Sequence, residues 1–92
     1  MEIVWSPQAL KDIESIGDFI AEDNPPRAIT FVDELIDSVE RLTRFPESGS
    51  IVEENPIFRQ IVYDGYRLIY QLRTKRILII AVLGPGRFLK KT

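Results

Sequence analysis

The sequence contains neither histidine nor cysteine among its 92 residues. Without cysteine, neither disulfides nor thiolate metal sites can hold the chain together. Without histidine and cysteine, the commonest general base, the thiol nucleophile and most transition-metal ligands are also missing. We therefore expect one modest apolar core, no cofactor and no metal site.

Long apolar runs are missing as well. No stretch approaches the roughly 20 apolar residues that a membrane-spanning helix needs, and the first residues carry an acid instead of a basic targeting segment. Apolar residues make up 45% and charged residues 28% of the chain, as in ordinary globular proteins. We expect a soluble, cytoplasmic protein with a single domain over residues 1–92.

Acidic residues are scarce in the second part of the chain. Residues 1–54 hold thirteen acids and four bases, whereas residues 55–92 hold one acid, Asp64, and eight bases. This asymmetry predicts a dipolar molecule whose basic surface meets a nucleic acid or an acidic protein segment. Basic residues also discourage pairing at strand edges, so a structural role stays open.

Two amphipathic helices follow a short opening strand, Ile3–Trp5. The first is expected over residues 7–22, where Ser6 suits the capping position and a proline the first turn. The second is expected over residues 27–44 and ends before Pro46. In both, apolar residues recur at intervals of three and four, which predicts an antiparallel helical hairpin with one buried stripe on each helix.

Beyond an expected irregular loop up to Pro56, the apolar period changes to two. Asp64-Gly65 accepts the positive φ angles of a two-residue hairpin turn. This turn pairs Tyr63 with Tyr66, Ile61 with Leu68 and Arg59 with Tyr70 on the side expected under the helices. The opposite, partly wet side then carries Phe58, Gln60, Val62, Arg67, Ile69 and Gln71.

The run from Ile77 to Leu83 is apolar on both faces and is expected at the centre of the sheet. The tail from Gly84 to Thr92 either crosses the wet face or hangs free. The element order β-α-α-β-β-β predicts an α+β fold in which a helical hairpin packs on one face of a mainly antiparallel four-stranded sheet.

Arginines are the remaining candidates for chemistry. Arg67 is expected on the wet face, and Arg87 follows a Gly-Pro-Gly segment that lets it converge there. Two neighbouring guanidinium groups would grip a phosphate or a carboxylate. Alternatively, Arg67 pairs with a carboxylate of the protein or stacks on Phe58.

The other candidates divide into binding and structural residues. We expect Glu53-Glu54 to be solvated loop charge, and Gly84-Pro85-Gly86 is too short for a phosphate-binding motif. The candidates for binding a target or a partner are Arg67, Arg73, Lys75, Arg76, Arg87, Lys90 and Lys91. Structural roles are expected for Arg59, Gly65, Tyr66 and Tyr70, and no residues have the spacing of metal ligands.

The sequence resembles the ParE and RelE toxin superfamily of type II toxin–antitoxin systems. The resemblance covers nearly the whole chain and depends on the order and spacing of several degenerate pieces. These are Trp5-Ser6-Pro7 with Ala9, Phe45-Pro46-Glu47-Ser48-Gly49, Phe58-Arg59 and Gly65-Tyr66-Arg67-Leu68-Ile69-Tyr70-Gln71. It implies a plasmid or chromosomal toxin that inhibits growth and is neutralised by a co-expressed antitoxin.

The resemblance also implies two possible targets: ParE-like toxins poison DNA gyrase, and RelE-like toxins cut messenger RNA on the ribosome. Arg67 and Arg87 match arginines that the RelE-like branch uses to hold the scissile phosphate. That branch also uses a tyrosine or histidine near the C-terminus, which this chain lacks, and Gly84 stands where many relatives have histidine. We therefore expect a gyrase-binding toxin, with the ribonuclease or an inactive interaction domain as alternatives.

Overall fold

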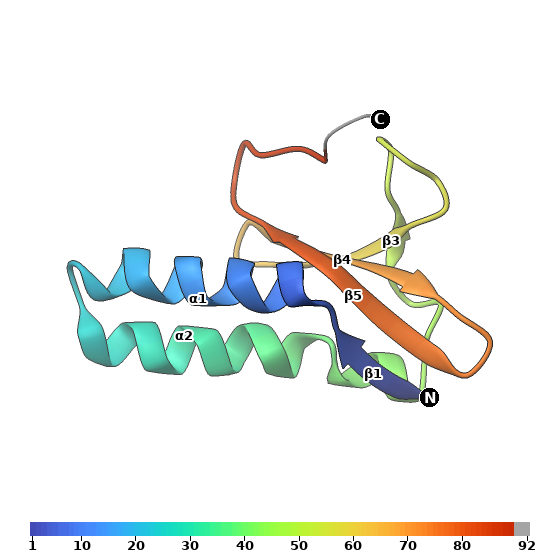
Figure 1. Cartoon of the computed structure of the whole chain (residues 1–92), viewed down its shortest axis with the longest axis horizontal. Coiled ribbons are helices and arrows are strands. Elements are labelled where there is room, and N and C mark those ends of the chain that lie inside the picture. Colours follow the sequence, from blue (N-terminus) through green and yellow to red (C-terminus); the bar gives the residue numbers. More distant parts are fainter. Residues whose placement is uncertain (90–92) are drawn as a thin grey trace.

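The computed structural model describes residues 1–89, in which two α-helices form a hairpin beside a five-stranded sheet (Figure 1). The strand order is β1-β5-β4-β3-β2, with β1 parallel to β5 and the other neighbours antiparallel. The elements are β1 (Glu2–Trp5), α1 (Pro7–Ala21), α2 (Pro25–Ser38), the 3₁₀ helix η1 (Glu40–Thr43), β2 (Ser50–Ile51), β3 (Arg59–Tyr63), β4 (Tyr66–Leu72) and β5 (Arg76–Leu83). This confirms the predicted α+β class.

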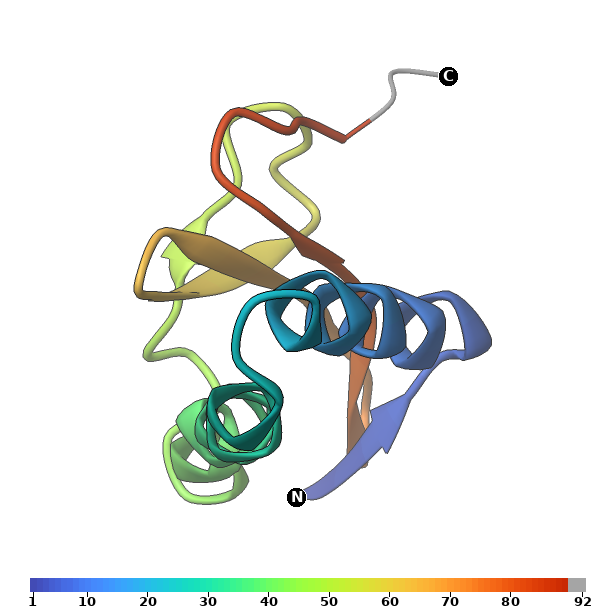
Figure 2. The same cartoon turned by 90° about the vertical axis from the view of Figure 1, so that its left-hand side faces the viewer.

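Both helices begin at side-chain caps. Ser6 Oγ accepts a hydrogen bond from the backbone N–H of Ala9 at 3.0 Å, and Asn24 Oδ1 accepts one from Arg27 at 3.2 Å. Each cap satisfies an N–H group that the first helical turn leaves without a partner. The helices then run side by side (Figure 2). Within the described residues, no helix has the length and apolar character needed to cross a membrane.

The second helix is shorter than expected. It ends at Ser38 instead of residue 44, and the chain continues as the 3₁₀ helix η1. The hydroxyl of Ser38 donates to the carbonyl of Leu35 at 2.6 Å and competes with the backbone there. The tighter turn still buries Val39 and Leu42 completely, so the apolar stripe alone does not distinguish the two kinds of helix.

The β3–β4 hairpin has the predicted register. Tyr63 lies opposite Tyr66, and Arg59 lies opposite Tyr70. The turn residues Asp64 and Gly65 have φ angles of 48° and 84°, which is the left-handed conformation that this turn requires. The predicted hairpin is therefore confirmed.

The expectation of four strands and of an irregular loop up to Pro56 is wrong. Within residues 1–89 a fifth strand, β2, pairs with β3, so that Ser50 lies opposite Gln60 and Ile51 opposite Arg59. Two residues are too few to produce an alternating pattern. The pairing depends on contacts from distant parts of the chain, including the Tyr70 hydroxyl, which accepts from the Gly49 N–H at 3.0 Å.

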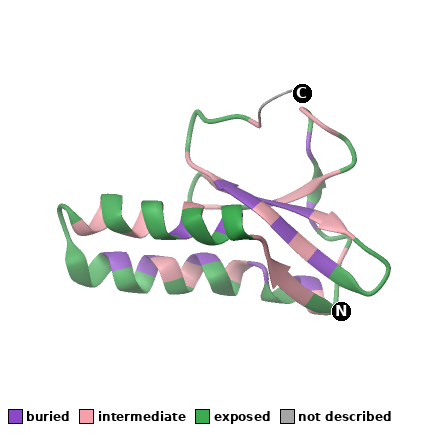
Figure 3. Ribbon diagram, in the orientation of Figure 1, coloured by how far each residue is buried: buried purple, intermediate pink, exposed green. Residues whose placement is uncertain are grey.

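The two faces of the sheet bury different sets of side chains. Figure 3 shows that buried residues are frequent along the central strands and along α2. The helix-covered face has the larger cluster, in which Leu68 and Tyr70 of β4 pack against Phe31 and Leu35 of α2. The smaller cluster on the outer face centres on Val52, Ile69 and Ala81.

Strand β5 contributes to both faces. A register shift between Ile69 and Tyr70 pairs them with Ala81 and Ile79, so Ile80 lacks a partner on β4. Ile79 consequently packs under the helices, and Ile80 and Ala81 both face outward. β5 has neighbours on both edges, but β4 occupies the centre of the sheet, where we expected β5.

Candidate functional site

A hollow of about 340 Å³ lies where the outer face of β3 and β4 meets the segment after β5. Gln60 and Arg67 come from the sheet, and Arg87 and Phe88 come from the segment. The chain turns back through Gly86, whose φ angle of 77° is one that glycine adopts readily. The expected candidates Arg67 and Arg87 therefore line the same hollow.

The guanidinium of Arg67 is held by an acid of the same chain. Arg67 Nη1 and Nη2 donate to the two carboxylate oxygens of Glu54 at 2.8 and 2.7 Å. Arg67 Nε donates to Gln60 Oε1 at 2.7 Å. This is a bidentate pair with a third contact, and only 17% of the Arg67 side chain and 15% of the Glu54 side chain are exposed.

The ion pair shifts the pKa values of both partners. The pKa of Glu54 is lowered to about 2, mainly by the hydrogen bonds from Arg67 and also by the backbone N–H of Leu89, against an opposing effect of burial. The same carboxylate raises the pKa of Arg67. At neutral pH the pair is fully ionised and carries no net charge.

The segment after β5 also meets Glu54. The backbone N–H of Leu89 donates to Glu54 Oε2 at 3.2 Å, and the side chain of Leu89 packs against the outer cluster. Figure 1 shows this segment returning over the side of the sheet that faces away from the helices. Arg87 itself is exposed, and among the described residues its guanidinium has no ion-pair partner.

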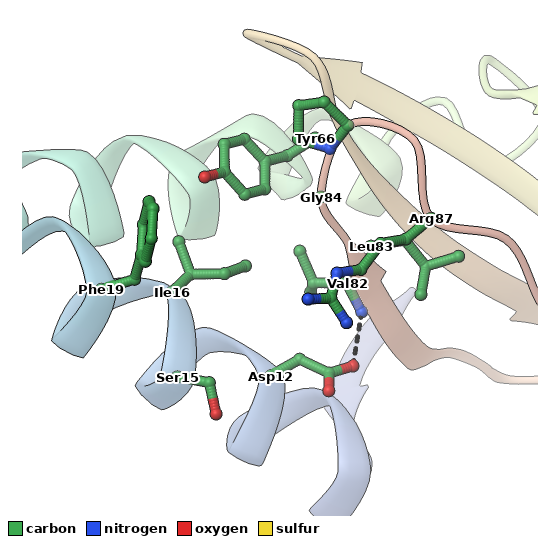
Figure 4. A pocket seen from close by; sticks show the side chains of 10 residues that line it. Asp12, Ser15, Ile16, Phe19, Tyr66, Val82, Leu83, Gly84 and Arg87 are labelled. Atoms are coloured by element: carbon green, nitrogen blue, oxygen red, sulfur yellow. Dashed lines mark hydrogen bonds between the residues drawn. The ribbon is translucent and has the colours of Figure 1, made fainter.

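Arg87 also borders a second cleft of about 580 Å³, between α1 and the segment after β5 (Figure 4). Asp12 and Phe19 line the cleft from α1, and Tyr66 lines it from the start of β4. Asp12 Oδ2 accepts a hydrogen bond from the backbone N–H of Val82 at 2.8 Å, which ties α1 to β5. The carboxylate therefore has a structural partner.

The other basic candidates do not join this site. Arg73, Lys75 and Arg76 are exposed at the turn between β4 and β5, at the opposite end of β4 from Arg67. The structure thus separates the basic residues into two groups. Lys90 and Lys91 lie outside the described residues.

Of the residues expected to be structural, Gly65 lines the hollow, whereas Arg59, Tyr66 and Tyr70 make their contacts elsewhere. Arg59 Nη1 donates to the carbonyls of Glu47 and Gly49, at 3.1 and 2.9 Å. The buried Tyr70 hydroxyl donates to the Pro46 carbonyl at 2.8 Å, and burial raises the pKa of Tyr70. Tyr66 packs on the helix side, edge to face with Phe31 at 5.3 Å between ring centroids.

Glu54 belongs to the site, although its sequence context did not predict this. We expected solvated loop charge, but Val52 anchors the loop by burying its side chain and by bonding its N–H to the Phe58 carbonyl at 3.0 Å. The anchored loop directs Glu54 towards Arg67. An acid two residues after an apolar residue is too common a pattern to have predicted this contact.

The described residues include no group of three or more His, Cys, Asp or Glu side chains that is arranged to hold a metal ion. The site therefore offers a neutralised ion pair, an exposed phenyl ring and the Arg87 guanidinium, which has no ion-pair partner among the described residues. Such a surface binds protein or phosphate groups by complementarity of shape and charge.

The described residues thus form a helical hairpin on one face of a small mixed sheet, with Arg67 on the outer face. The model of the family described as the ParE toxin of the type II toxin–antitoxin system parDE matches residues 3–87. The chain therefore belongs to the ParE toxin family. None of the curated proteins compared with it matches in sequence.

Two solved structures are similar to this chain. A chain of the chromosomal ParDE toxin–antitoxin system from P. aeruginosa is 19% identical with a TM-score of 0.85, and the similarity covers 94% of this chain and 97% of that one. A chain of the RelBE2 toxin–antitoxin complex from Mycobacterium tuberculosis is 17% identical with a TM-score of 0.67. This similarity covers 90% of our chain and 95% of that one. At these identities the similarities show the fold.

Proposed function

We propose that this toxin inhibits growth by binding DNA gyrase and does not cut RNA itself. The observation that carries this proposal is the pairing of Arg67 with Glu54. An arginine that stabilises a scissile phosphate must offer its donors to that phosphate. In this chain both Nη atoms already bind a carboxylate, and Nε already binds Gln60.

The outer face also offers little for moving a proton. The chain has no histidine, and Tyr63, Tyr66 and Tyr70 all pack with the helix-side cluster. Glu54 is a weak base because its pKa is lowered to about 2. General acid–base catalysis contributes about 10²- to 10⁴-fold to such reactions, so RNA cleavage at this site lacks a major contribution.

Membership of the ParE family supports gyrase as the target, because the resemblance described above implies that ParE-like toxins poison this enzyme. Binding needs no catalytic group. It needs an exposed surface with aromatic and arginine side chains, which Phe88 and Arg87 provide. A gyrase target places the action of the toxin in the cytoplasm.

The test is a supercoiling assay with purified toxin and gyrase. Inhibition of supercoiling, or accumulation of cleaved DNA, supports the proposal. An unaffected gyrase at a large molar excess of toxin contradicts it.

The second candidate is a ribosome-dependent ribonuclease, favoured by the fact that Arg67 and Arg87 line one hollow. If this candidate is right, messenger RNA is cut on translating ribosomes and Arg67→Ala abolishes cleavage. Intact transcripts after induction exclude it.

We further propose a cognate antitoxin as the partner. Because Arg87 and the β4–β5 turn are basic and exposed, the antitoxin should cover them with an acidic and apolar segment. Expression of the toxin alone should stop growth, and co-expression of the antitoxin should restore it. Unimpaired growth with the toxin alone would indicate an inactive interaction domain.

A further inference from the structure

The Glu54 carboxylate connects three separate parts of the chain. Its own loop follows β2, Arg67 belongs to β4, and Leu89 belongs to the segment after β5. Glu54 Oε2 accepts from both Arg67 Nη1 and the Leu89 N–H, at 2.8 and 3.2 Å. One oxygen atom therefore joins the sheet to the returning segment.

The segment after β5 has few other attachments. Within it, the N–H of Arg87 donates to the carbonyl of Gly84 at 3.1 Å, which closes a turn but does not hold the turn to the sheet. The carbonyl of Arg87 lies at 3.5 Å from Arg67 Nη1, a long contact. The other contacts of this segment among the described residues are those of Leu89, which packs against the outer cluster, and of Gly84 and Pro85, which lie close to Tyr66 and Gly65.

The same segment exposes the two side chains best suited to bind a protein. Phe88 is 72% exposed, the highest fraction among the large apolar residues described, and Arg87 has no ion-pair partner among those residues. Aromatic and arginine side chains dominate binding energies at protein interfaces when their positions are set before binding. Leu89 follows them directly, so holding Leu89 restricts both.

We propose that Glu54 is a positioning residue that, together with Arg67, holds the segment after β5 on the outer face and so presents Arg87 and Phe88 to a protein target. This inference rests on the proposed function, in which the toxin acts by binding. Arg67 then has a different role from a phosphate grip: it orients the carboxylate that accepts from Leu89. The occupant of the exposed surface is a protein with acidic and apolar groups.

The first measurement is amide hydrogen exchange on the isolated toxin. Glu54→Ala should accelerate exchange of the Leu89 amide about tenfold, because its acceptor is lost. The Val82 amide, bonded to Asp12, is the internal reference and should not change. The matched control is Glu53→Ala, which removes an exposed neighbouring acid whose side chain makes no hydrogen bond among the described residues.

Glu54→Ala leaves the Arg67 guanidinium without its carboxylate partner, which could disturb folding. Two further variants keep the test decisive in that case. Glu54→Gln retains an oxygen acceptor for Leu89 and should accelerate exchange less than Glu54→Ala. The double variant Glu54→Ala/Arg67→Ala removes both charges, and should still release Leu89. Unchanged exchange at Leu89 in all of these variants overturns the proposal.

The second measurement is the toxin concentration that gives half-maximal inhibition of gyrase, with growth inhibition in parallel. Glu54→Ala should raise this concentration by several-fold, in the same direction as Arg87→Ala, while Glu53→Ala leaves it unchanged. If Glu54→Ala accelerates exchange of the Leu89 amide but leaves gyrase inhibition unchanged, then Glu54 does not help to present Arg87 and Phe88 to the target. If the unmodified toxin does not affect gyrase, the proposed function fails, while Leu89 exchange and growth inhibition still decide the role of Glu54.

Discussion

The two faces of the sheet differ in how they are stabilised. The helix-covered face buries a large set of interlocking apolar side chains from both helices and four of the strands. The outer face buries a few apolar residues and adds a partly exposed ion pair that joins a loop to the segment after β5. The first arrangement resists change, whereas the second leaves polar groups and exposed side chains available for binding.

Neighbouring residues of β4 allow the largest test of this contrast. Leu68 and Ile69 are both completely buried, but Leu68 faces the helices and Ile69 faces outward. Truncating a buried aliphatic residue to alanine costs about 2–5 kcal/mol, depending on how far the site collapses. The loss in unfolding free energy, measured by urea unfolding, should lie near the upper end of this range for Leu68→Ala and near the lower end for Ile69→Ala. Equal losses would mean that the two faces contribute alike.

The Tyr70 hydroxyl allows a smaller test. It donates to Pro46 and accepts from the buried Gly49 N–H, so Tyr70→Phe leaves both backbone groups without this partner. We expect a loss of about 1–3 kcal/mol in unfolding free energy. Tyr66→Phe is the control, because the Tyr66 hydroxyl makes no hydrogen bond among the described residues, and it should have little effect. If the two variants behave alike, the Tyr70 hydroxyl does not fix the β2 region.

The ion pair on the outer face predicts a pH dependence. The folded protein lowers the pKa of Glu54 from 4.5 to about 2, so folding favours the ionised carboxylate. Its contribution is complete above pH 4.5 and disappears as the pH falls towards 2. The difference in melting temperature between the toxin and Glu54→Gln should therefore shrink across this interval. A constant difference would show that the carboxylate is not held in its ionised form.

The smallest effect on stability is expected at the β4–β5 turn. Arg73, Lys75 and Arg76 are exposed, and their replacement by glutamine should change the unfolding free energy by less than about 0.5 kcal/mol. If the turn helps to attract an acidic partner, these glutamine variants should associate with that partner more slowly than the unmodified toxin at low salt. The difference in association rate should vanish at high salt. Association kinetics at two salt concentrations measure this, and identical rates at low salt would remove the turn from the binding surface.

Periodicity and turn chemistry predicted most of the fold. The helical stripes, the cap at Ser6 and the Asp64-Gly65 turn are local features with local causes, and the structure has them. Strand β2 depends on contacts between distant residues, such as Gly49 with Tyr70. No local pattern records such contacts.

The candidate site was predicted only in part. Alternation along β4 placed Arg67 on the outer face, and the Gly-Pro-Gly segment brought Arg87 to the same hollow. The acid that pairs with Arg67 was not predicted, because its position depends on the path of an irregular loop. Of the two alternatives for Arg67, pairing with a carboxylate is the one observed, and no stacking on Phe58 is observed among the described residues.

The parallel pairing of β1 with β5 has a consequence for the newly synthesised chain. Glu2 lies opposite Arg76, so the first strand emerges from the ribosome long before its neighbour exists. At about 5–20 residues per second, several seconds of translation separate the two strands. The sheet is completed only after β5 has been synthesised, so the chain acquires its full fold long after its first strand has emerged.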